Sequence, residues 1–142
     1  MSRIARGAAV GAVAGILWKA VEPLLQKEFG SPYSDAGIAS RFVSSSEAAA
    51  YATQALGGAV FGAAFARFGG RGIDAAVKTA LLENAALWPA VAVVQRYHPD
   101  VQSGRWPKPF ADPGSIQVSF AGHAIYGVIL GALLDPPRVR SR

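Results

Sequence analysis

Ionisable side chains lie inside long apolar stretches of this 142-residue chain, where they could do chemistry. Glu83 lies near the middle of one stretch, and His123 lies in another, three residues before Tyr126. A charged side chain at the centre of a membrane-spanning helix costs roughly 2.5–3.5 kcal/mol, so an acid there usually has a partner or a function. Histidine exchanges protons near neutral pH. Glu83 and His123 are therefore candidates for proton transfer or for ligand binding.

Other polar residues in the same stretches extend this candidate site. The predicted intramembrane polar site consists of Lys19, Glu22, Gln54, Glu83, Asn84, His123 and Tyr126. Structural roles explain several of these residues as well. Lys19 and Glu22 are three residues apart and can neutralise each other on one helix. Glu83 can pair with Lys78, and His123 can hydrogen-bond to a neighbouring helix. Both interpretations stay open at this point.

Motifs of soluble enzymes do not occur in the sequence. There is no Walker phosphate-binding loop, no nucleophile elbow and no zinc-protease motif. The absence of cysteine excludes disulfides, thiol catalysis and cysteine-ligated metals. His98, Asp100 and Asp112 are metal-ligating residue types, but their spacing matches no established pattern. We predict a protein that is not an enzyme and that has no cofactor and no metal site.

Four apolar stretches must position these residues, and each approaches the roughly 20 residues that a helix needs to cross a bilayer. Ser44 and Glu47 form a capping-box pattern before the second stretch, and Gly69 and Gly70 follow it. The first stretch is expected to end or bend near Pro23. The short connection between the second and third predicts an antiparallel hairpin. We thus predict an all-α, single-domain membrane four-helix bundle over residues 1–142, with spans at about 4–25, 47–68, 73–95 and 115–134.

A soluble, alanine-rich helical bundle is the alternative, because the mean hydropathy is only +0.26. Soluble helices, however, carry a continuous charged face. Residues 10–17 and 55–66 contain no charge at all. Charged residues make up 16% of the chain, against about 25% in soluble domains. These observations favour an integral membrane protein that lies in the lipid bilayer.

Small residues recur at four-residue spacing in the apolar stretches, which places them on one face of each helix. Such stripes let helix backbones touch in a bilayer. We predict that the helices pack through Gly7, Gly11, Gly15, Gly58, Gly62, Gly127 and Gly131. The third stretch repeats Ala76, Ala80, Asn84 and Trp88 at the same spacing. The pattern predicts a bundle that is tight at one end and opens, at the other, to a polar layer containing Lys19, Gln54 and His123.

Positive charge predicts the orientation, since cytoplasmic segments of membrane proteins are enriched in Lys and Arg. The N-terminus, the 69–72 turn and the C-terminal tail carry this excess, whereas acids dilute it in the two longer connections. Both termini are therefore predicted to be cytoplasmic. The residues concerned are Arg3, Arg6, Arg67, Arg71, Arg138, Arg140 and Arg142. The net charge of +5 comes with no basic-aromatic patch, so no nucleic-acid partner is predicted.

Two short motifs resemble those of a known family. Gly11-Ala-Val-Ala-Gly15, followed by Lys19 and Glu22, resembles the glycine-rich start of the YagU-like bacterial inner-membrane proteins. Phe120-Ala-Gly-His123, after a proline-rich connection that contains Trp106, resembles that family's late Phe-Gly-His helix. The spacing of the Lys and Glu differs, and the family's Pro-Pro-Arg after the first span is missing. The resemblance implies a bacterial inner, or cytoplasmic, membrane protein and a link to acid tolerance.

Two functions are compatible with these patterns. The first is a transport or binding module whose polar layer handles protons, ions or a small ligand. The second is a non-catalytic accessory or scaffold subunit of a larger membrane complex. Because the glycine stripes occur on more helices than one compact bundle needs, we also predict a homo-oligomer or assembly with other membrane subunits.

Overall fold

The computed structural model describes residues 1–136, and within them all regular structure is helical. The prediction of an all-α protein is therefore confirmed. The long helices are α1 (Arg3–Phe29), α3 (Glu47–Phe68), α4 (Gly72–Val94) and α6 (Pro113–Leu134). Short helices lie in the connections: α2 (Asp35–Ser40), α5 (Pro99–Gln102) and the 3-10 turn η1 (Pro109–Ala111). Three arginines of the predicted cytoplasmic set, at 138, 140 and 142, lie outside the described residues.

The ends of the long helices follow the local sequence, with two departures from expectation. The cap of α3 is Ser46, whose hydroxyl accepts from the Ala49 amide. The Ser44 hydroxyl instead accepts from the Ser46 amide and donates to the Ser46 hydroxyl. Of the two expectations for Pro23, an end or a bend of the first helix, the end does not occur, because the helix continues through Pro23 to Phe29. It ends at Gly30, whose φ of 63° lies in the left-handed region that glycine adopts without strain.

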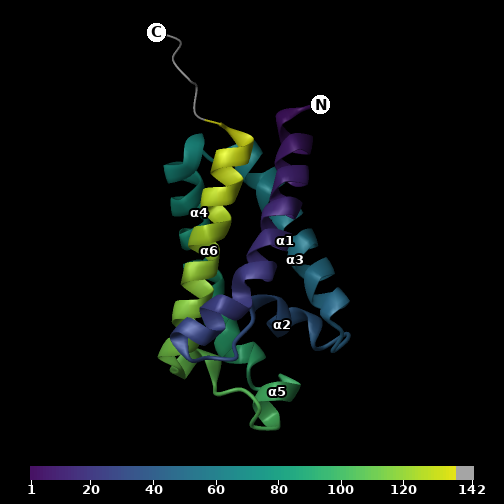
Figure 1. Ribbon diagram of the computed structural model, residues 1–142, viewed down its shortest axis with the longest axis vertical. Helices are drawn as coiled ribbons and strands as arrows, with labels where there is room; N and C mark the ends of the chain where they lie inside the picture. Colours follow the sequence, from purple (N-terminus) through teal and green to yellow (C-terminus); the bar gives the residue numbers. More distant parts are fainter. Residues whose placement is uncertain (137–142) are drawn as a thin grey trace.

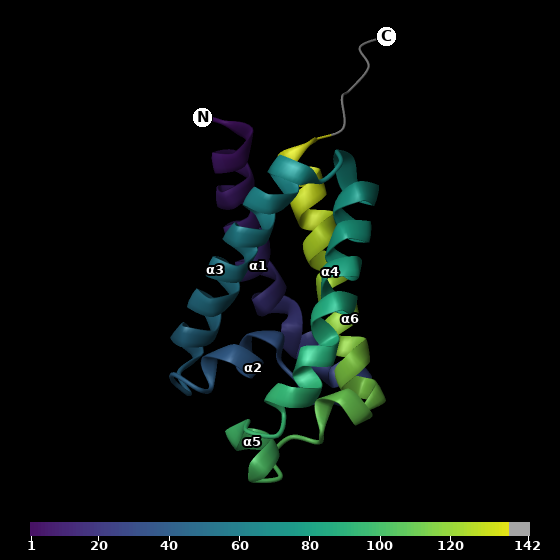
Figure 2. The same ribbon diagram turned by 180° about the vertical axis from the view of Figure 1, so that it is seen from behind.

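The four long helices form two closely packed pairs, α1 with α3 and α4 with α6, and α1 also packs on α6. Figures 1 and 2 show the pairs side by side from opposite directions. The helices α3 and α4 run in opposite directions after a short turn, but they diverge and make few contacts. The two helices of the predicted hairpin are thus connected by a short turn but do not pack on each other along their length. Each of them packs its small-residue face on a different neighbour.

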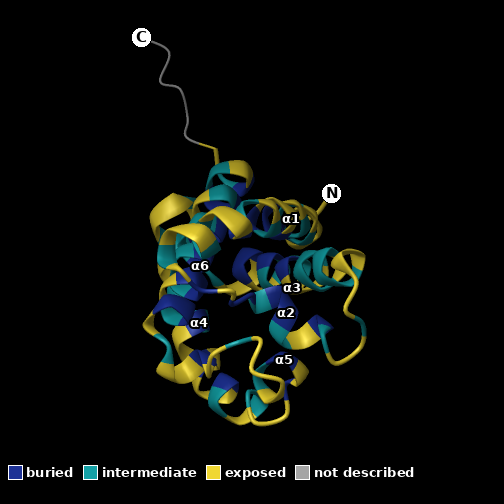
Figure 3. Cartoon of the chain, turned by 60° about the horizontal axis from the view of Figure 1, so that its bottom comes forward, coloured by how far each residue is buried: buried dark blue, intermediate teal, exposed yellow. Residues whose placement is uncertain are grey.

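Three of the long helices, α1, α4 and α6, are long and apolar enough to cross a membrane. This finding supports a membrane-embedded protein, and α3 is not among the three. The outward faces of the long helices expose large apolar side chains, as the exposed surfaces in Figure 3 follow the outside of the bundle. They include Val13, Leu17 and Leu24 on α1, Leu56 and Val60 on α3, Leu82 and Val93 on α4, and Val128 and Leu133 on α6.

Glycines bring the backbones of α1 and α3 into direct contact. A methyl group added to Gly11 would lie 2.1 Å from the carbonyl oxygen of Gly58, and one on Gly7 would lie 2.4 Å from that of Gly62. Gly15 meets the Gln54 carbonyl in the same way, at 2.3 Å. No side chain fits at these distances, so the packing of α1 on α3 requires glycine at these three positions of α1.

The other two helix contacts also use glycine. A methyl group on Gly127 would lie 2.6 Å from the Cα of Val77, and one on Gly131 would lie 2.6 Å from the Cα of Ile73. These residues hold α6 against α4. On the side of α6 that faces α1, a methyl group on Gly122 would lie 2.1 Å from the indole nitrogen of Trp18.

One end of the molecule gathers the N-terminus, the 69–72 turn and the end of α6 (Figure 1). Arg3 joins all three segments. Its guanidinium donates to the carbonyls of Ala66 and Gly70 and to Asp135 Oδ2, the last at 3.0 Å. Asp135 Oδ2 also accepts from the Gly72 amide at 3.2 Å. The opposite end carries α2 and α5 (Figures 1 and 2).

Asp112 starts α6 at this opposite end. Its Oδ2 accepts from the amide of Ser115 at 2.8 Å, from the hydroxyl of Ser115 at 2.6 Å and from the hydroxyl of Ser31 at 3.0 Å. Partial burial alone would raise the pKa of Asp112, but these hydrogen bonds outweigh it and lower the pKa below its ordinary value of 3.8. Asp112 thereby caps α6 and ties it to the segment that follows α1.

The glycine contact between α1 and α3 predicts an effect on stability. We expect Gly58→Ala to lower the free energy of unfolding by about 1–3 kcal/mol, because the new methyl group meets the Gly11 carbonyl. Thermal unfolding in detergent micelles, followed by circular dichroism, measures the loss. Gly57→Ala is the matched control, since a methyl group there has no neighbour within 4 Å. Equal losses for the two variants would contradict the close backbone contact.

The helix cap predicts a second, pH-dependent effect. We expect Asp112→Ala to cost about 1 kcal/mol of stability at pH 7, and Asp112→Asn to cost less because an amide oxygen still caps. Because the pKa of Asp112 is lowered in the folded protein, its charge stabilises the fold at pH values above the ordinary pKa. This stabilisation is lost as the pH falls through the pKa of Asp112 in the folded protein. The stability difference between wild type and Asp112→Asn should therefore shrink below about pH 4. Urea unfolding at pH 7 and pH 3 in the same detergent measures it, and a constant difference would refute this account.

Candidate functional site

A cavity of about 300 Å³ lies between α3 and α4, where the two helix pairs diverge. We call it the central cavity. Its aromatic wall consists of Trp18, Tyr33, Phe61, Trp88 and Tyr126. Its polar groups are Asp35, Gln54, Glu83, Asn84 and His123. Apolar walls with a few convergent polar groups are typical of small-molecule sites.

Glu83 and His123 face each other across the boundary between α4 and α6. The His123 Nε2 lies 3.2 Å from Glu83 Oε2, and its Nδ1 lies 2.9 Å from the Ser119 carbonyl oxygen. A carbonyl only accepts, so Nδ1 must carry a hydrogen. Nε2 is then left to share one proton with the Glu83 carboxyl, as an ion pair or as a neutral pair. This arrangement holds an exchangeable proton at the wall of the central cavity.

Asp35 joins a second set of polar groups in the same cavity. Its Oδ1 accepts from the Tyr33 hydroxyl at 2.9 Å, and the Ser119 hydroxyl lies 2.9 Å away. The same Ser119 hydroxyl lies 3.0 Å from Asn84 Oδ1. Because a hydroxyl donates only one hydrogen, Ser119 cannot serve both oxygens at once. An Asn84 amide turned by 180° would resolve this conflict, with Nδ2 donating to Ser119 and Ser119 donating to Asp35.

This network leaves buried polar atoms without a protein partner. Asn84 is 3% exposed, and its Nδ2 has no hydrogen-bond partner among the described residues. With the amide turned, Oδ1 would be the atom left over instead. Asp35 Oδ2 is likewise buried without a hydrogen bond. A buried polar atom without a hydrogen bond costs about 1–3 kcal/mol of stability. A molecule in the cavity that forms hydrogen bonds with these atoms would remove that cost.

Burial is the main influence on the charge of Asp35. It raises the pKa of this carboxyl, and the nearby charge of Glu83 raises it further. His123 and the hydroxyls of Ser119 and Tyr33 act in the opposite direction without cancelling the effect. Burial and the Asp35 charge also raise the pKa of Tyr33, which stays a hydrogen donor. Folding therefore shifts Asp35 toward its protonated form, relative to an exposed aspartate.

The structure divides the seven residues of the predicted polar site into two groups. Five of them, Gln54, Glu83, Asn84, His123 and Tyr126, line the central cavity. Tyr126 also donates its hydroxyl to the Gly58 carbonyl at 2.8 Å, which joins α6 to α3.

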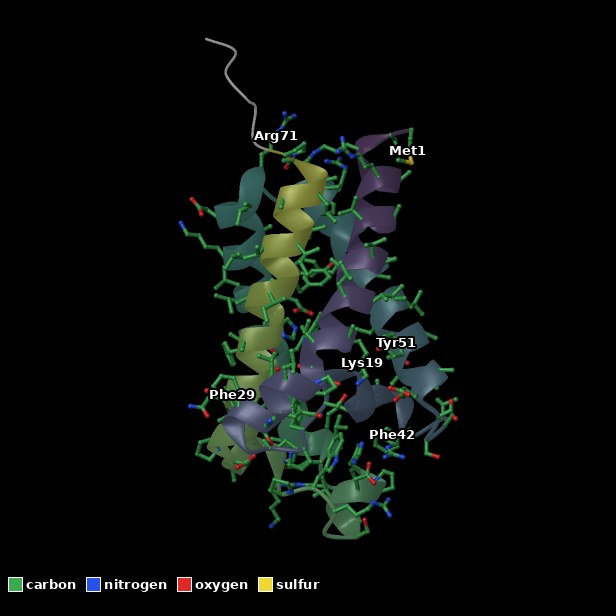
Figure 4. All side chains as sticks on the ribbon, viewed as in Figure 1. Met1, Lys19, Phe29, Phe42, Tyr51 and Arg71 are labelled. Carbon is green, nitrogen blue, oxygen red and sulfur yellow. The ribbon has the colours of Figure 1, made fainter. Side chains whose placement is uncertain are left out.

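Lys19 and Glu22 lie apart from the central cavity. They form an ion pair with each other, and the Ser34 hydroxyl donates to Glu22 Oε2 at 2.9 Å. Lys19 lines a separate hollow of about 250 Å³, bordered by α2 and the start of α3. Asp35 and Ile38 of α2 face the central cavity, whereas Ser34 and Gly37 face the hollow. Figure 4 shows Lys19 in the half of the molecule opposite to Met1 and Arg71.

Sequence reasoning missed Asp35, Tyr33 and Ser119 as members of the site. Asp35 and Tyr33 belong to the polar connection between the first and second apolar stretches, and this connection folds back as α2 and contacts α3. A signal was present in the sequence. Ser34 is a helix N-cap residue, and its hydroxyl accepts from the Gly37 amide at 3.0 Å. The apolar residues that follow it are typical of a packed helix rather than an exposed loop.

The long connection before α6 is held by its own polar contacts. Asp100 is buried, and its carboxylate lies 2.6 Å from Arg105 Nε and 3.0 Å from Arg41 Nε. The ring of His98 stacks on Trp106 and lies 3.1 Å from the Gly37 carbonyl. Among the described residues, no group of three or more acids and histidines lies close enough to hold a metal ion. These contacts fix α5 and its flanks against α2.

Comparisons of this chain with models of protein families, with characterised proteins and with solved structures find no match. The resemblance to the YagU-like proteins therefore stays a prediction. The fold and the site define a class by themselves. The chain is a small helical protein with membrane-compatible helices and a polar, aromatic cavity between its two helix pairs.

The raised pKa of Asp35 predicts how stability depends on pH. The contribution of Asp35 to stability is complete below the pKa that it has in the unfolded chain, which is near 4. This contribution is lost as the pH rises through the pKa of Asp35 in the folded protein. Asp35→Asn cannot ionise, so the variant should gain stability relative to wild type as pH rises. Midpoint temperatures of thermal unfolding in micelles from pH 4 to pH 9 measure this gain. Glu28→Gln, an exposed carboxyl at the end of α1, controls for the loss of one charge. A difference that does not change with pH would show that Asp35 is not buried as a neutral acid.

Proposed function

We propose that the chain is a small multi-pass protein of a bacterial cytoplasmic membrane that binds a small molecule in its central cavity. The observation that carries the proposal is the set of buried, unpartnered polar atoms at the cavity wall, above all the Asn84 amide. The hydrocarbon of a bilayer offers no hydrogen bonds, so such atoms need partners within the protein or from a ligand. The proton shared by Glu83 and His123 gives the same site a means of linking binding to proton transfer.

Four spans, rather than three, are part of this proposal. Within α3 no charged residue occurs between Glu47 and Arg67. Its outward residues Leu56 and Val60 are 68% and 64% exposed, which suits contact with lipid. The backbone contacts from Gly7 to Gly15 also hold α3 alongside α1. If α1 crosses the membrane, α3 must lie at the same depth.

The cytoplasmic location of both termini is a further part of the proposal. Arg3, Arg6, Arg67 and Arg71 belong to the end of the molecule that carries the N-terminus (Figure 1). Positive charge at this end favours the cytoplasmic side. The connections with α2 and α5 would then lie on the outer side, close to the central cavity.

Assembly with a second copy or with other subunits stays a proposal, and so does the alternative role as an accessory subunit. The glycine stripes predicted such assembly. Because Gly7, Gly11 and Gly15 meet α3, and Gly127 and Gly131 meet α4, these stripes are occupied within the chain. Assembly would therefore have to use other surfaces. The accessory role requires only that the polar residues hold the helices together.

An accessible cavity distinguishes a binding module from a scaffold. The chain has no cysteine, so single-cysteine variants report on one position each. Gly57→Cys places a thiol on the cavity wall without a clash, and Val60→Cys places one on the outward face of the same helix. We expect a water-soluble methanethiosulfonate reagent to modify Gly57→Cys in membrane vesicles at least tenfold faster than Val60→Cys. Equal, slow modification of both thiols would favour the scaffold role.

The orientation is tested with the same reagent on intact cells. Ser103→Cys lies in the connection after α5, and Arg71→Cys lies in the turn between α3 and α4; both positions are exposed. We expect Ser103→Cys to be labelled on intact cells and Arg71→Cys only after permeabilisation. The reverse pattern would place the termini on the outer side.

A further inference from the structure

Acidic groups outnumber basic groups in the wall of the central cavity. Asp35 on α2 and Glu83 on α4 line it, and among the described residues that line it none is Lys or Arg. His123 on α6 is the single basic group, and it is bonded to Glu83. The walls from α1 and α3 contribute aromatic, small and amide residues but no charge. Lys19 and Glu22 form an ion pair with each other and do not belong to the lining of the cavity.

The aromatic wall, like the acids, favours a positively charged ligand. Five aromatic rings line the cavity together with these acids. The faces of aromatic rings attract cations, and the attraction is stronger where water is excluded. Aromatic rings beside carboxylates therefore recognise an ammonium group that carries apolar substituents, in preference to an inorganic cation that needs a shell of oxygen ligands.

Two buried N–H groups add a further requirement. The indole Nε1 atoms of Trp18 and Trp88 have no hydrogen-bond partner among the described residues. Both residues line the cavity, Trp18 on α1 and Trp88 on α4. A ligand that carries a carbonyl or ether oxygen next to its positive group would satisfy one of these donors.

From this arrangement we infer that the central cavity binds an organic cation with an apolar body and an oxygen acceptor, and that the cation enters as a proton leaves. The inference rests on the proposed binding function and names its ligand class. Without the ligand, the shared proton keeps the Glu83–His123 pair neutral overall, and burial favours the protonated form of Asp35. A cation in a site of low dielectric needs a negative partner. Release of the proton from Asp35 or from the Glu83–His123 pair supplies that partner, and the charge balances.

The test compares two probes of the same shape. Benzoylcholine carries a quaternary ammonium, an ester oxygen and a phenyl ring, and 3,3-dimethylbutyl benzoate is its uncharged isostere. Titration calorimetry with the wild-type protein in lipid nanodiscs measures both affinities from pH 6 to pH 8. We expect benzoylcholine to bind at least tenfold more tightly than the isostere at pH 8. Its Kd should fall about tenfold per pH unit where one proton is released. Buffers with different ionisation enthalpies count that proton directly.

Variants locate the binding to this cavity. Glu83→Gln and, independently, Asp35→Asn should each reduce the preference for benzoylcholine at least fivefold. Asp74→Asn removes an exposed acid from the first turn of α4 and should leave the preference unchanged. Gly57→Phe should block both probes by filling the cavity, whereas Val60→Phe on the outward face should block neither. The two acid variants serve as alternatives if one of them fails to fold.

The outcomes separate this inference from the proposed function. Equal affinity for the two probes, with block by Gly57→Phe, would overturn the cation preference and leave the binding function standing. Failure of both probes to bind would overturn the binding function for ligands of this size, and the inference with it. Tight binding of benzoylcholine without proton release would overturn the exchange. Cation-selective binding with one proton released, lost in Glu83→Gln or Asp35→Asn, supports the whole inference.

Discussion

The backbone contact between α1 and α3 determines where the rest of the chain can go. Because Gly11 and Gly58 leave no space between the two helices, α3 is committed to α1 along its small-residue face. It makes few contacts with α4, although only a short turn joins them. The helix α4 instead packs on α6 through Gly127 and Gly131. Because α3 packs on α1 and α4 packs on α6, the helices α3 and α4 diverge, and the central cavity lies between them. The position of the cavity therefore follows from the positions of the glycines.

The same helix faces that pack tightly at one end carry the polar groups of the cavity farther along. On α3 the stripe runs from Gly62 through Gly58 to Gln54, and on α6 it runs from Gly127 to His123. The glycines bring two backbones together, whereas the longer polar side chains of Gln54 and His123 line the central cavity. Close packing and an open polar site are therefore two parts of one pattern, in which residue size changes along a shared helix face.

Much of this arrangement could be predicted from the sequence, because helix length and four-residue spacing are local properties. The ends of α3 coincide with the predicted stretch 47–68, and five of the seven predicted polar residues line one cavity. The choice of partner helix could not be predicted, since stripes on several helices look alike in a sequence. Asp35 was missed because a connection folds inward only when the surrounding helices offer a place for it. Lys19 lines a separate hollow, whereas Gln54 and His123 of the same predicted layer line the central cavity.

The helix α2 differs from the other walls of the cavity in how it is held. The long helices meet through close backbone contacts at glycines. Side chains hold α2 instead: Ser34 bonds to Glu22 on one face, and His98 lies against the Gly37 carbonyl on another. Asp35, the acid that α2 brings to the cavity, thus lies on a wall held by side-chain hydrogen bonds, whereas Glu83 and His123 pair between α4 and α6, which meet at glycines.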